Sequence, residues 1–468
     1  MQPQKRKLTE RQMEALRRRR REERMRALVL IAVTLALCVG AALFVMRPDE
    51  PDHVKMAIAS RPTATPAPTA VPTAAPTMAP TAQPTTATQT TTVPTGAPSA
   101  APTSAPTAVP TTVPTATPEP ELRSVRLRIG GSVTVSDAQL SRAFADGQNV
   151  SYNFAPQFEL IQGALSNADY TLLTLETTLG LYDGMDYSGT SRFNSPDTLL
   201  APLAEAGVDM LKLGTDNILD RWFDGHKNTV SFADVYGFQS VGAYPPREES
   251  AAANIVALNG ITFGFVSYVV TTHGLEDVSD AGAMLFGVSY LSSADVEGDI
   301  QRLRDAGADI VVALAHWGGD YDRNPTQSQM QQAERLARAG ADIILGSNPQ
   351  VLQPMGVVNL EENGATRPIF VAYSLGNLLT TNETDTAAAG MILELTVTER
   401  ADGVCAVTSA GYVPTWCWKH DGTVQVIAAS QYRSAPPEGM SAEDWRAMSD
   451  SMARTAEMMG AQFAILNP

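Results

Sequence analysis

One pattern recurs along this chain and limits the folds open to it. "LAEAGVDMLKLGTDN" begins at Leu203, "LRDAGADIVVALAHW" at Leu303 and "LARAGADIILGSNPQ" at Leu336, with a looser copy from Gly163. Each copy predicts a helix that ends near glycine or asparagine, a short connector with aspartate, and a strand that is apolar throughout. Strands without polar alternation are typical of sheets covered on both faces. Because the spacing between copies is irregular, we expect αβ units of an α/β domain with parallel strands rather than a solenoid.

Other segments predict strands outside these units. Asn259 and Gly260 separate two apolar runs between Ile255 and Val270, which is typical of a tight hairpin. Strands are also expected at "RPIFVAYSLGN", "GMILELTVTE" and "GVCAVTSAGYVPTWCW", so the domain contains a mixed sheet or two packed sheets. From Ser441, "SAEDWRAMSDSMARTAEMMG" predicts a capped amphipathic helix.

The N-terminal part of the chain differs from this domain in composition. Residues 1–26 contain eleven Lys/Arg and four Glu, and residues 27–46 form an uncharged apolar run of twenty residues, long enough to cross a bilayer as one helix. The basic flank and the lack of a clear small-residue cleavage site favour an uncleaved anchor over a secretory signal peptide. Residues 47–124 are rich in Pro, Thr and Ala, which predicts a disordered stalk with polyproline II character.

These features predict five regions and a location. The regions are a basic cytoplasmic segment (1–26), a transmembrane helix (27–46), a disordered stalk (47–124), an α/β domain (125–430) and a C-terminal helical tail (431–468). The basic flank places the N-terminus in the cytoplasm, so we expect a single-pass protein of the cell membrane whose C-terminal domain is extracellular. Orientation and contact with anionic lipid explain the basic run, and no nucleic-acid partner is expected.

Charge restricts the ligands of the exported part. The whole chain has a net charge of −16 and its first 26 residues carry +7, so the remainder carries −23. Such a charge repels anionic polymers at long range, although salt screens the repulsion beyond about 8 Å. The sequence has no clustered basic run outside the cytoplasmic segment. We therefore expect a neutral ligand, a protein partner or a bridging cation.

The three cysteines leave one question open. Cys38 lies in the apolar run, while Cys405 and Cys417 flank "AVTSAGYVPTW". A hairpin centred near Gly411 would place Cys405 and Cys417 opposite each other. Either a disulfide or two buried free thiols would fit an exported domain, and the spacing does not decide between them.

Polar side chains follow four of the predicted strands. Ligands of open α/β sheets bind beyond the carboxyl ends of the strands, so a shared pocket is expected there. Solvated loops with capping side chains are the alternative, although a His-Trp pair at an apolar strand end is hard to explain as a cap. The candidate pocket residues are Glu176, Thr215, Asp216, Asn217, Asp220, His316, Trp317, Ser347, Asn348 and Gln350.

The order of these segments resembles the CapA family of capsule and poly-γ-glutamate synthesis proteins, whose domain has a calcineurin-like metallophosphatase fold. "HWGGDYDRNPTQSQMQQAERLARAGADIILG" is similar to the family's HWG-x-E-Y block and the helix and strand after it, with Asp320 in place of the glutamate. "FVAYSLGNLL" and "YVPTWCWK" are similar to its YSLGNF and late PTW segments. The resemblance covers about residues 125–430 and implies a layered α/β sandwich of metallophosphatase type.

The positions that carry the family's chemistry differ in this chain. Gly131 stands where the family has the aspartate of a GD pair, and only Glu176 remains of its N-x-E motif. His316 corresponds to the histidine of HWG. Ser347 and Gln350 occupy the histidine positions of a GHxPH-type loop.

A second motif of the family, ANNH-x-x-D, is also altered. In "GTDNILD", Thr215 and Asp216 replace the two asparagines, Asn217 replaces the histidine and Asp220 stays. His226 follows a few residues later and is either a displaced ligand or a surface residue of a helix.

Metal-assisted hydrolysis requires anionic or imidazole ligands around one or two cations. Amide and hydroxyl side chains bind hard ions only weakly. Glu176, Asp216 and His316 are therefore weak candidate metal ligands. The pattern specifies no cofactor, and a divalent metal ion stays an alternative.

The resemblance and the altered motifs together predict a function. We expect a non-catalytic or weakly catalytic domain, a pseudoenzyme that binds or scaffolds a cell-envelope polymer or its synthesis machinery. The first alternative is a metal-dependent, phosphoesterase-like hydrolase with a rearranged site. The second is a structural or adhesion module carried on the stalk. The sequence identifies no catalytic residue, polymer or oligomeric state.

Overall fold

The computed structural model of the chain describes residues 122–468 apart from 181–185, 245–252, 276–286, 363, 383 and 385. The predicted cytoplasmic segment, the predicted transmembrane helix and nearly all of the predicted stalk lie outside the described residues. Within the described part of the chain, no helix has both the length and the apolar character needed to cross a bilayer.

Strands and helices alternate through most of the described chain. The strands are β1 (Ser124–Val133), β2 (Tyr170–Leu175), β3 (Thr178–Leu179), β4 (Asn194–Ser195), β5 (Met210–Lys212), β6 (Gln239–Val241), β7 (Ile255–Leu258), β8 (Ile261–Val269), β9 (Ile310–His316), β10 (Ile343–Ser347), β11 (Leu352–Glu362), β12 (Ala365–Leu375), β13 (Asn377–Leu379), β14 (Ala389–Glu399), β15 (Cys405–His420), β16 (Thr423–Ala428) and β17 (Ala464–Ile465). The helices are α2 (Asp137–Asp146), α3 (Ala155–Phe158), α4 (Gln162–Ser166), η1 (Asp197–Leu199), α5 (Leu200–Glu205), α6 (Trp222–Val235), α8 (Val296–Asp305), α9 (Gln327–Arg338), η3 (Ala429–Tyr432) and α10 (Ala442–Met459).

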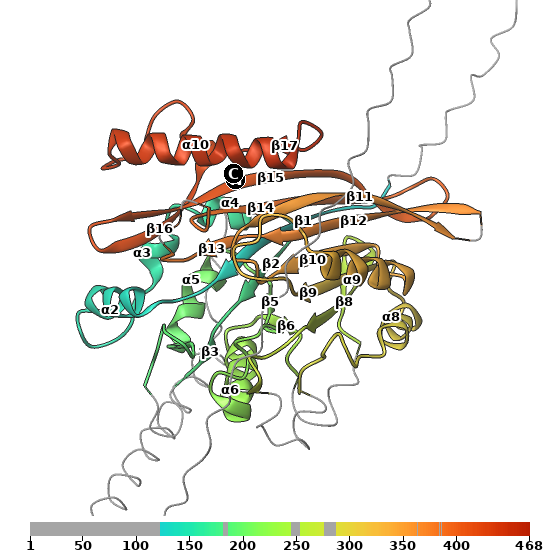
Figure 1. Ribbon diagram of the computed structural model, residues 1–468, viewed down its shortest axis with the longest axis horizontal. Coiled ribbons are helices and arrows are strands. Elements are labelled where there is room, and N and C mark those ends of the chain that lie inside the picture. Colours follow the sequence, from blue (N-terminus) through green and yellow to red (C-terminus); the bar gives the residue numbers. More distant parts are fainter. Residues whose placement is uncertain are drawn as a thin grey trace, which may run out of the picture. The chain divides into compact units, whose positions relative to one another are not determined.

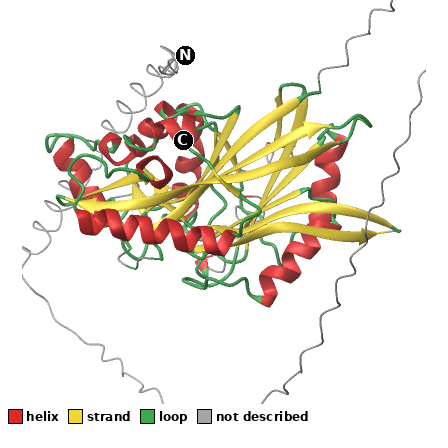
Figure 2. Ribbon diagram, turned by 90° about the horizontal axis from the view of Figure 1, so that it is seen from above, coloured by secondary structure: helices red, strands yellow, loops and turns green. Residues whose placement is uncertain are grey.

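Two mixed sheets form the centre of the domain (Figures 1 and 2). Among the described strands, the larger sheet has the order β16-β15-β14-β1-β2-β5-β6, with β13 paired to β1 and β17 paired to β15. The second sheet has the order β11-β12-β10-β9-β8-β7, and β3 pairs with β4 separately. Parallel pairs join β1, β2, β5 and β6 in one sheet and β8, β9, β10 and β12 in the other. The predicted α/β domain is confirmed, and of the two arrangements left open by the sequence the structure has two packed sheets.

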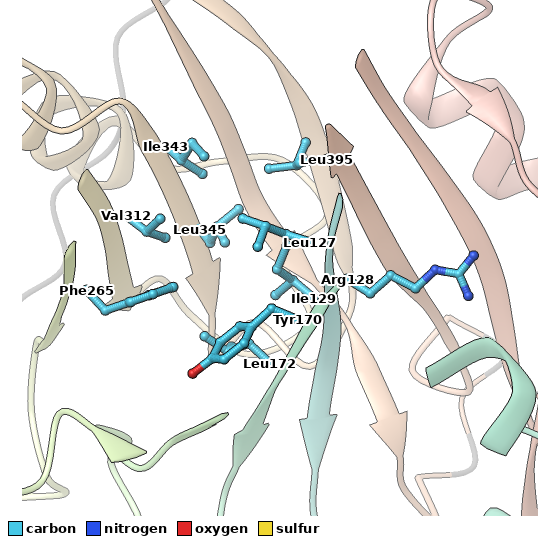
Figure 3. A pocket seen from close by; sticks show the side chains of 10 residues that line it. All are labelled: Leu127, Arg128, Ile129, Tyr170, Leu172, Phe265, Val312, Ile343, Leu345 and Leu395. Carbon is cyan, nitrogen blue, oxygen red and sulfur yellow. The ribbon is translucent and has the colours of Figure 1, made fainter. Parts of the chain in front are cut away.

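Apolar side chains from both sheets fill the space between them. Leu127 and Ile129 of β1 belong to the same buried cluster as Val312 of β9 and Leu345 of β10. Figure 3 shows these side chains pointing toward one another, while Arg128 of β1 points away. The cavity among them is only about 10 Å³. Burying each such side chain stabilises the fold by about 1.5–3 kcal/mol, so this interface fixes one sheet against the other.

Helices cover the outer faces of the two sheets. α5 and α6 share a core with the larger sheet that includes Leu173, Leu203 and Phe232. α8 and α9 cover the second sheet through Ile300 and Leu336. Because each central strand is buried on both faces, its sequence shows no polar alternation.

The four recurring phrases form the predicted αβ units α4–β2, α5–β5, α8–β9 and α9–β10. Gly207, Gly307 and Gly340 follow three of these helices with φ of 85°, 93° and 110°, a conformation that ends a helix and favours glycine. The connector aspartates share a role: each carboxylate accepts a hydrogen bond from a backbone N–H of the neighbouring parallel strand. The pairs are Asp169 with Arg126 (2.7 Å), Asp209 with Thr171 (2.9 Å), Asp309 with Thr262 (2.8 Å) and Asp342 with Val311 (2.8 Å).

Two further local predictions are confirmed. Asn259 and Gly260 have φ of 47° and 83° and join β7 to β8 as a hairpin. Ser441 precedes α10 and accepts a hydrogen bond from the backbone N–H of Asp444 over 3.0 Å. α10 lies over β15 (Figure 1), so residues 431–468 pack onto the larger sheet.

The strand predicted at "GVCAVTSAGYVPTWCW" is confirmed, and the hairpin near Gly411 that would place Cys405 and Cys417 opposite each other does not form. Residues 405–420 form the single strand β15, which pairs with both β14 and β16. Gly411 lies in the middle of this strand opposite Ala464 of β17, where a side chain would crowd the partner strand. Cys405 and Cys417 are therefore about 40 Å apart, at about 3.3 Å per residue, and cannot form a disulfide. Both are buried free thiols.

Candidate functional site

Side chains at the carboxyl ends of parallel strands from both sheets meet at one place. Ser132 lies near the end of β1, Glu176 follows β2 and Lys212 ends β5. His316 and Ser347 end β9 and β10 of the second sheet. Hydrogen bonds join the two groups, so each sheet supplies half of the site.

Glu176 is buried, and both of its carboxylate oxygens accept hydrogen bonds. Ser132 Oγ donates to Oε1 over 2.6 Å. Gln350 Nε2 donates to Oε2 over 2.8 Å, and Thr134 Oγ1 lies 3.4 Å from the same oxygen. His316 Nδ1 lies 4.0 Å from Oε1. These neighbours stabilise a carboxylate that burial alone would disfavour.

His316 links Asp216 to Ser347. Its Nε2 lies 3.0 Å from Asp216 Oδ1, and its Nδ1 lies 2.8 Å from Ser347 Oγ. The second oxygen of Asp216 pairs with His273 Nε2 at 2.9 Å, and the side chain of His273 is 50% exposed. Burial raises the pKa of Asp216, but the charge of His316 and hydrogen bonds from both histidines outweigh it and hold this pKa well below its usual range. The hydrogen bond to Asp216 raises the pKa of His273 to about 9.

Lys212 brings an amine into the interior of this network. It is 1% exposed, and its Nζ donates a hydrogen bond to Ser347 Oγ. Burial lowers the pKa of Lys212 to about 7, although the charges of Glu176 and Asp216 favour the protonated form. The amine is therefore partly protonated at neutral pH and supplies positive charge beside two carboxylates.

Two predicted pocket residues have partners outside this network. Trp317 is buried in the core of the second sheet, where its Nε1 donates to the carbonyl oxygen of Tyr373 over 3.0 Å. Asn348 Nδ2 donates to the carbonyl oxygen of Gly318 over 2.9 Å. The indole and the amide thus hold the loops after β9 and β10 in place.

Thr215, Asn217 and Asp220 stabilise the turn after β5. Asp220 Oδ2 accepts hydrogen bonds from Asn217 Nδ2 over 2.9 Å and from the backbone N–H of Phe193 over 2.7 Å. Burial raises the pKa of Asp220 to about 6 against the effect of these bonds. Thr215 is buried, and its hydroxyl has no partner among the described residues.

His226 is neither a ligand of the site nor a surface residue. It is buried in α6, its ring stacks on Phe223, and its Nε2 lies 3.0 Å from the carbonyl oxygen of Gly287. Burial lowers its pKa to about 4, so the imidazole is neutral. The helix turns this side chain into the protein interior, which the sequence spacing did not show.

Comparison with known sequences identifies the family. The pattern of the family described as "Bacterial capsule synthesis protein PGA_cap" matches residues 126–382, more than half of the chain. This chain belongs to that family. The hydrogen-bonded side chains at the strand ends are called the strand-end network from here on. They are Ser132, Thr134, Glu176, Lys212, Asp216, His273, His316, Ser347 and Gln350. The matched region contains all of them, so the network lies in a capsule synthesis domain.

The similarity to known relatives extends over only part of each relative's length. The PGA biosynthesis protein CapA of Bacillus subtilis (strain 168) is 32% identical over 181 residues, which is 38% of this chain and 44% of the relative. The capsule biosynthesis protein CapA of Bacillus anthracis is 28% identical over 233 residues, 47% of this chain and 53% of the relative. The chain thus spans about half the length of these curated relatives.

Solved structures give weaker similarities. The calcineurin-like phosphoesterase YfkN from Bacillus subtilis has a TM-score of 0.36 at 14% identity, covering 72% of this chain and 97% of that one. The NAD nucleotidase NadN of Haemophilus influenzae has a TM-score of 0.35 at 9% identity, covering 73% and 64%.

Four members of the network were absent from the sequence prediction: Ser132, Thr134, Lys212 and His273. Gly131 has no space for a side chain, since a Cβ there would lie 2.3 Å from the carbonyl oxygen of Gly376, and it is Ser132 that reaches Glu176. Lys212 could have been suspected from its charge within the apolar run "MLKLG". His273 lies four residues after the end of β8, in the loop that follows the predicted apolar run from Ile255 to Val270, so its position just beyond a strand was an available signal.

The three candidate metal ligands of this PGA_cap domain do not fit a metal ion. Both oxygens of Glu176, both oxygens of Asp216 and both ring nitrogens of His316 are already within hydrogen-bond distance of neighbouring side chains. Among the described residues, no group of three or more His, Cys, Asp or Glu side chains is arranged to hold a metal ion. The amine of Lys212 adds a positive charge beside Ser347 that would repel a cation.

Three side chains of the site form a hydrogen-bonded row of a carboxylate, an imidazole and a hydroxyl, which is the composition of a catalytic triad. Asp216, His316 and Ser347 follow one another through hydrogen bonds in the order of a serine-hydrolase triad, but the imidazole is reversed: Nε2 faces the aspartate and Nδ1 faces the serine. Two features weaken Ser347 as a nucleophile: it is only 7% exposed, and Lys212 donates a hydrogen bond to its oxygen. The geometry therefore favours a structural network over nucleophilic attack.

Replacing Lys212 by methionine should change how stability depends on pH. The amine has a pKa of about 7 in the folded chain and about 10.5 when unfolded, so between these values the unfolded state binds more protons. The contribution of Lys212 to the free energy of unfolding then rises with pH in the wild type and is absent from Lys212→Met. Urea denaturation should show that the difference, wild type minus variant, increases from about pH 7 to about pH 10.

Lys227→Met is the matched control, because it removes a half-exposed lysine of α6 and changes the net charge equally. A difference for Lys212→Met that stays flat across this range would show that Lys212 titrates normally and is not held in a dry site.

Proposed function

We propose that this chain is a membrane-anchored, extracellular capsule synthesis protein that binds or scaffolds an envelope polymer or its synthesis machinery without metal-dependent hydrolysis. The observation that carries this proposal is the strand-end network, in which Glu176, Asp216 and His316 have all their donor atoms paired within the protein. Relatives named for poly-γ-glutamate and capsule synthesis support an envelope polymer as the context.

The neutral side chains of the site stabilise the network because they form hydrogen bonds with its buried charged groups. Gln350 donates to Glu176, and Ser347 links Lys212 to His316. A buried carboxylate or amine that loses its partner typically costs about 3–5 kcal/mol. A metal ion could bind only after several of these contacts were broken, so the rearranged metal-dependent hydrolase is the less supported alternative.

Metal content tests this proposal directly. The full-length protein, without a histidine tag, is incubated with Mn²⁺ or Zn²⁺ and desalted, and bound metal is counted by elemental analysis. We expect far less than one equivalent, because no ligand atom of the three residues is free. One or more equivalents, lost in His316→Ala, would overturn the proposal and favour a hydrolase.

A triple variant, Lys212→Met with Ser347→His and Gln350→His, is the positive control. It removes the buried amine and places imidazoles where the resemblance expects histidines, so it should retain more metal than the wild type.

The anchored location rests on the N-terminal sequence. A basic flank followed by an apolar run of twenty residues supports a single span with the C-terminal domain outside the cell. Proteinase K added to intact cells should cut within residues 47–124 and release a fragment that begins in this stretch, since the Pro/Thr/Ala-rich composition predicts disorder there. Full resistance in intact cells together with cleavage after lysis would place the domain inside and contradict the proposal.

Ser347 offers a second candidate function, because it lies at the end of the Asp216–His316 pair. A fluorophosphonate probe followed by peptide mass spectrometry decides between this and a non-catalytic network. We expect no labelling of Ser347, since the hydroxyl is buried and held by Lys212. Labelling that disappears in His316→Ala but persists in Lys227→Met would establish a serine nucleophile instead.

A further inference from the structure

A second part of the domain has the form of a ligand pocket. A cavity of about 430 Å³ lies between α2, α3 and the turn from β15 to β16, elements that are neighbours in Figure 1. This volume lies within the range of about 300–1,000 Å³ that is typical of small-molecule sites. No residue of the strand-end network lines it.

The inner wall of this pocket contains a polar group without a partner. The backbone N–H of Ser136 donates to Gln139 Oε1 over 2.8 Å, so Gln139 uses its Nε2 to donate to Gln157 Oε1 over 3.3 Å. These two hydrogen bonds fix which way the side-chain amide of Gln157 is oriented: its oxygen faces Gln139. Its Nε2 is left without an acceptor among the described residues. Gln157 is 0% exposed, and a buried donor left unpaired costs about 1–3 kcal/mol. The wall is therefore suited to a ligand that brings an acceptor.

Lys419 adds positive charge to the same pocket. Its Nζ donates to the carbonyl oxygen of Thr381, which uses one of its three N–H groups. Within the described part of the chain, no carboxylate lies in salt-bridge distance of this ammonium. Lys419 therefore has both charge and donors available for a ligand.

The remaining polar groups of the lining also favour an acceptor. Arg142 pairs through Nε with Asp146 and donates from Nη1 to the carbonyl oxygen of Asp421 over 2.9 Å. The hydroxyl of Thr423 is buried without a partner among the described residues. The carboxylate of Asp421 lies at the rim, where its side chain is 93% exposed to water. His420, the remaining basic residue of the lining, lies 3.6 Å from Asp421, so among the described lining residues Lys419 is the cation with no carboxylate in salt-bridge distance.

We propose that this pocket binds a carboxylate-bearing ligand about the size of one or two amino-acid residues. Lys419 makes the charged contact, and Gln157 donates from the inner wall. Among the described residues, Lys419 has no carboxylate partner and Asp146 already pairs with Arg142, so the pocket can neutralise one carboxylate group; a second carboxylate of the ligand stays in solvent, whereas both charges of a phosphate lie on one group. Such a site lets an acidic molecule bind locally although the net charge beyond residue 26 is −23. The proposal does not depend on the function of the strand-end network.

Titration calorimetry of the full-length protein with glutarate and with its neutral diamide, glutaramide, tests the charge requirement. We expect saturable binding of glutarate in the presence of chelator and at least roughly tenfold weaker binding of glutaramide. Equal binding of the two probes, or no saturable binding of glutarate, would overturn the proposal. Tighter binding of inorganic phosphate than of glutarate would overturn the choice of carboxylate.

Variants locate the site. Lys419→Met should weaken glutarate binding by roughly tenfold or more, Lys419→Arg should retain most of it, and Lys227→Met should leave it unchanged. Binding unaffected by Lys419→Met would place the ligand elsewhere.

A measurement on the wild type covers the case in which Lys419→Met does not fold. Acetylation of Lys419 by acetic anhydride, followed by mass spectrometry, should be slowed by glutarate and not by glutaramide. Equal rates with and without glutarate would contradict the proposal.

Discussion

The packing of the two sheets against each other is the constraint on which the rest of the structure depends. Leu127 and Ile129 of one sheet and Val312 and Leu345 of the other exclude water from the interface and fix the relative position of the strands. The carboxyl ends of parallel strands from both sheets then lie together. For this reason Lys212 of β5 can contact Ser347 of β10, although 135 positions separate them in the sequence.

Features encoded by neighbouring residues could be predicted from the sequence, and features that depend on distant partners could not. The αβ units were predictable because a glycine such as Gly307 ends the helix and an aspartate such as Asp309 binds the adjacent strand. The sequence predicted a strand at β15 but left open a hairpin near Gly411, and only pairing with β14, β16 and β17, which holds Gly411 in an extended conformation, decides between them. Lys212 was missed for the same reason: its partner lies on another sheet.

The neutral residues at the strand ends have a physical explanation. Carboxylates and amines cannot be buried without hydrogen bonds, and several kcal/mol are lost when such a group has no partner. Gln350 satisfies an oxygen of Glu176, and Ser347 serves both Lys212 and His316. The residues that replace the expected histidines are therefore polar because the charges around them remain, which simple solvent exposure would not require.

The strand-end network and the pocket beside α2 differ in how their polar groups are satisfied. In the network, each carboxylate oxygen of Glu176 and Asp216 has a partner within the protein, so a ligand would compete with contacts that already exist. In the pocket, the amide of Gln157 has an unused donor, and Lys419 has no carboxylate partner among the described residues. A ligand gains most free energy where it supplies the missing acceptor and displaces nothing. Recognition of an acidic molecule is thus favoured at the pocket, while the strand-end network stabilises the fold.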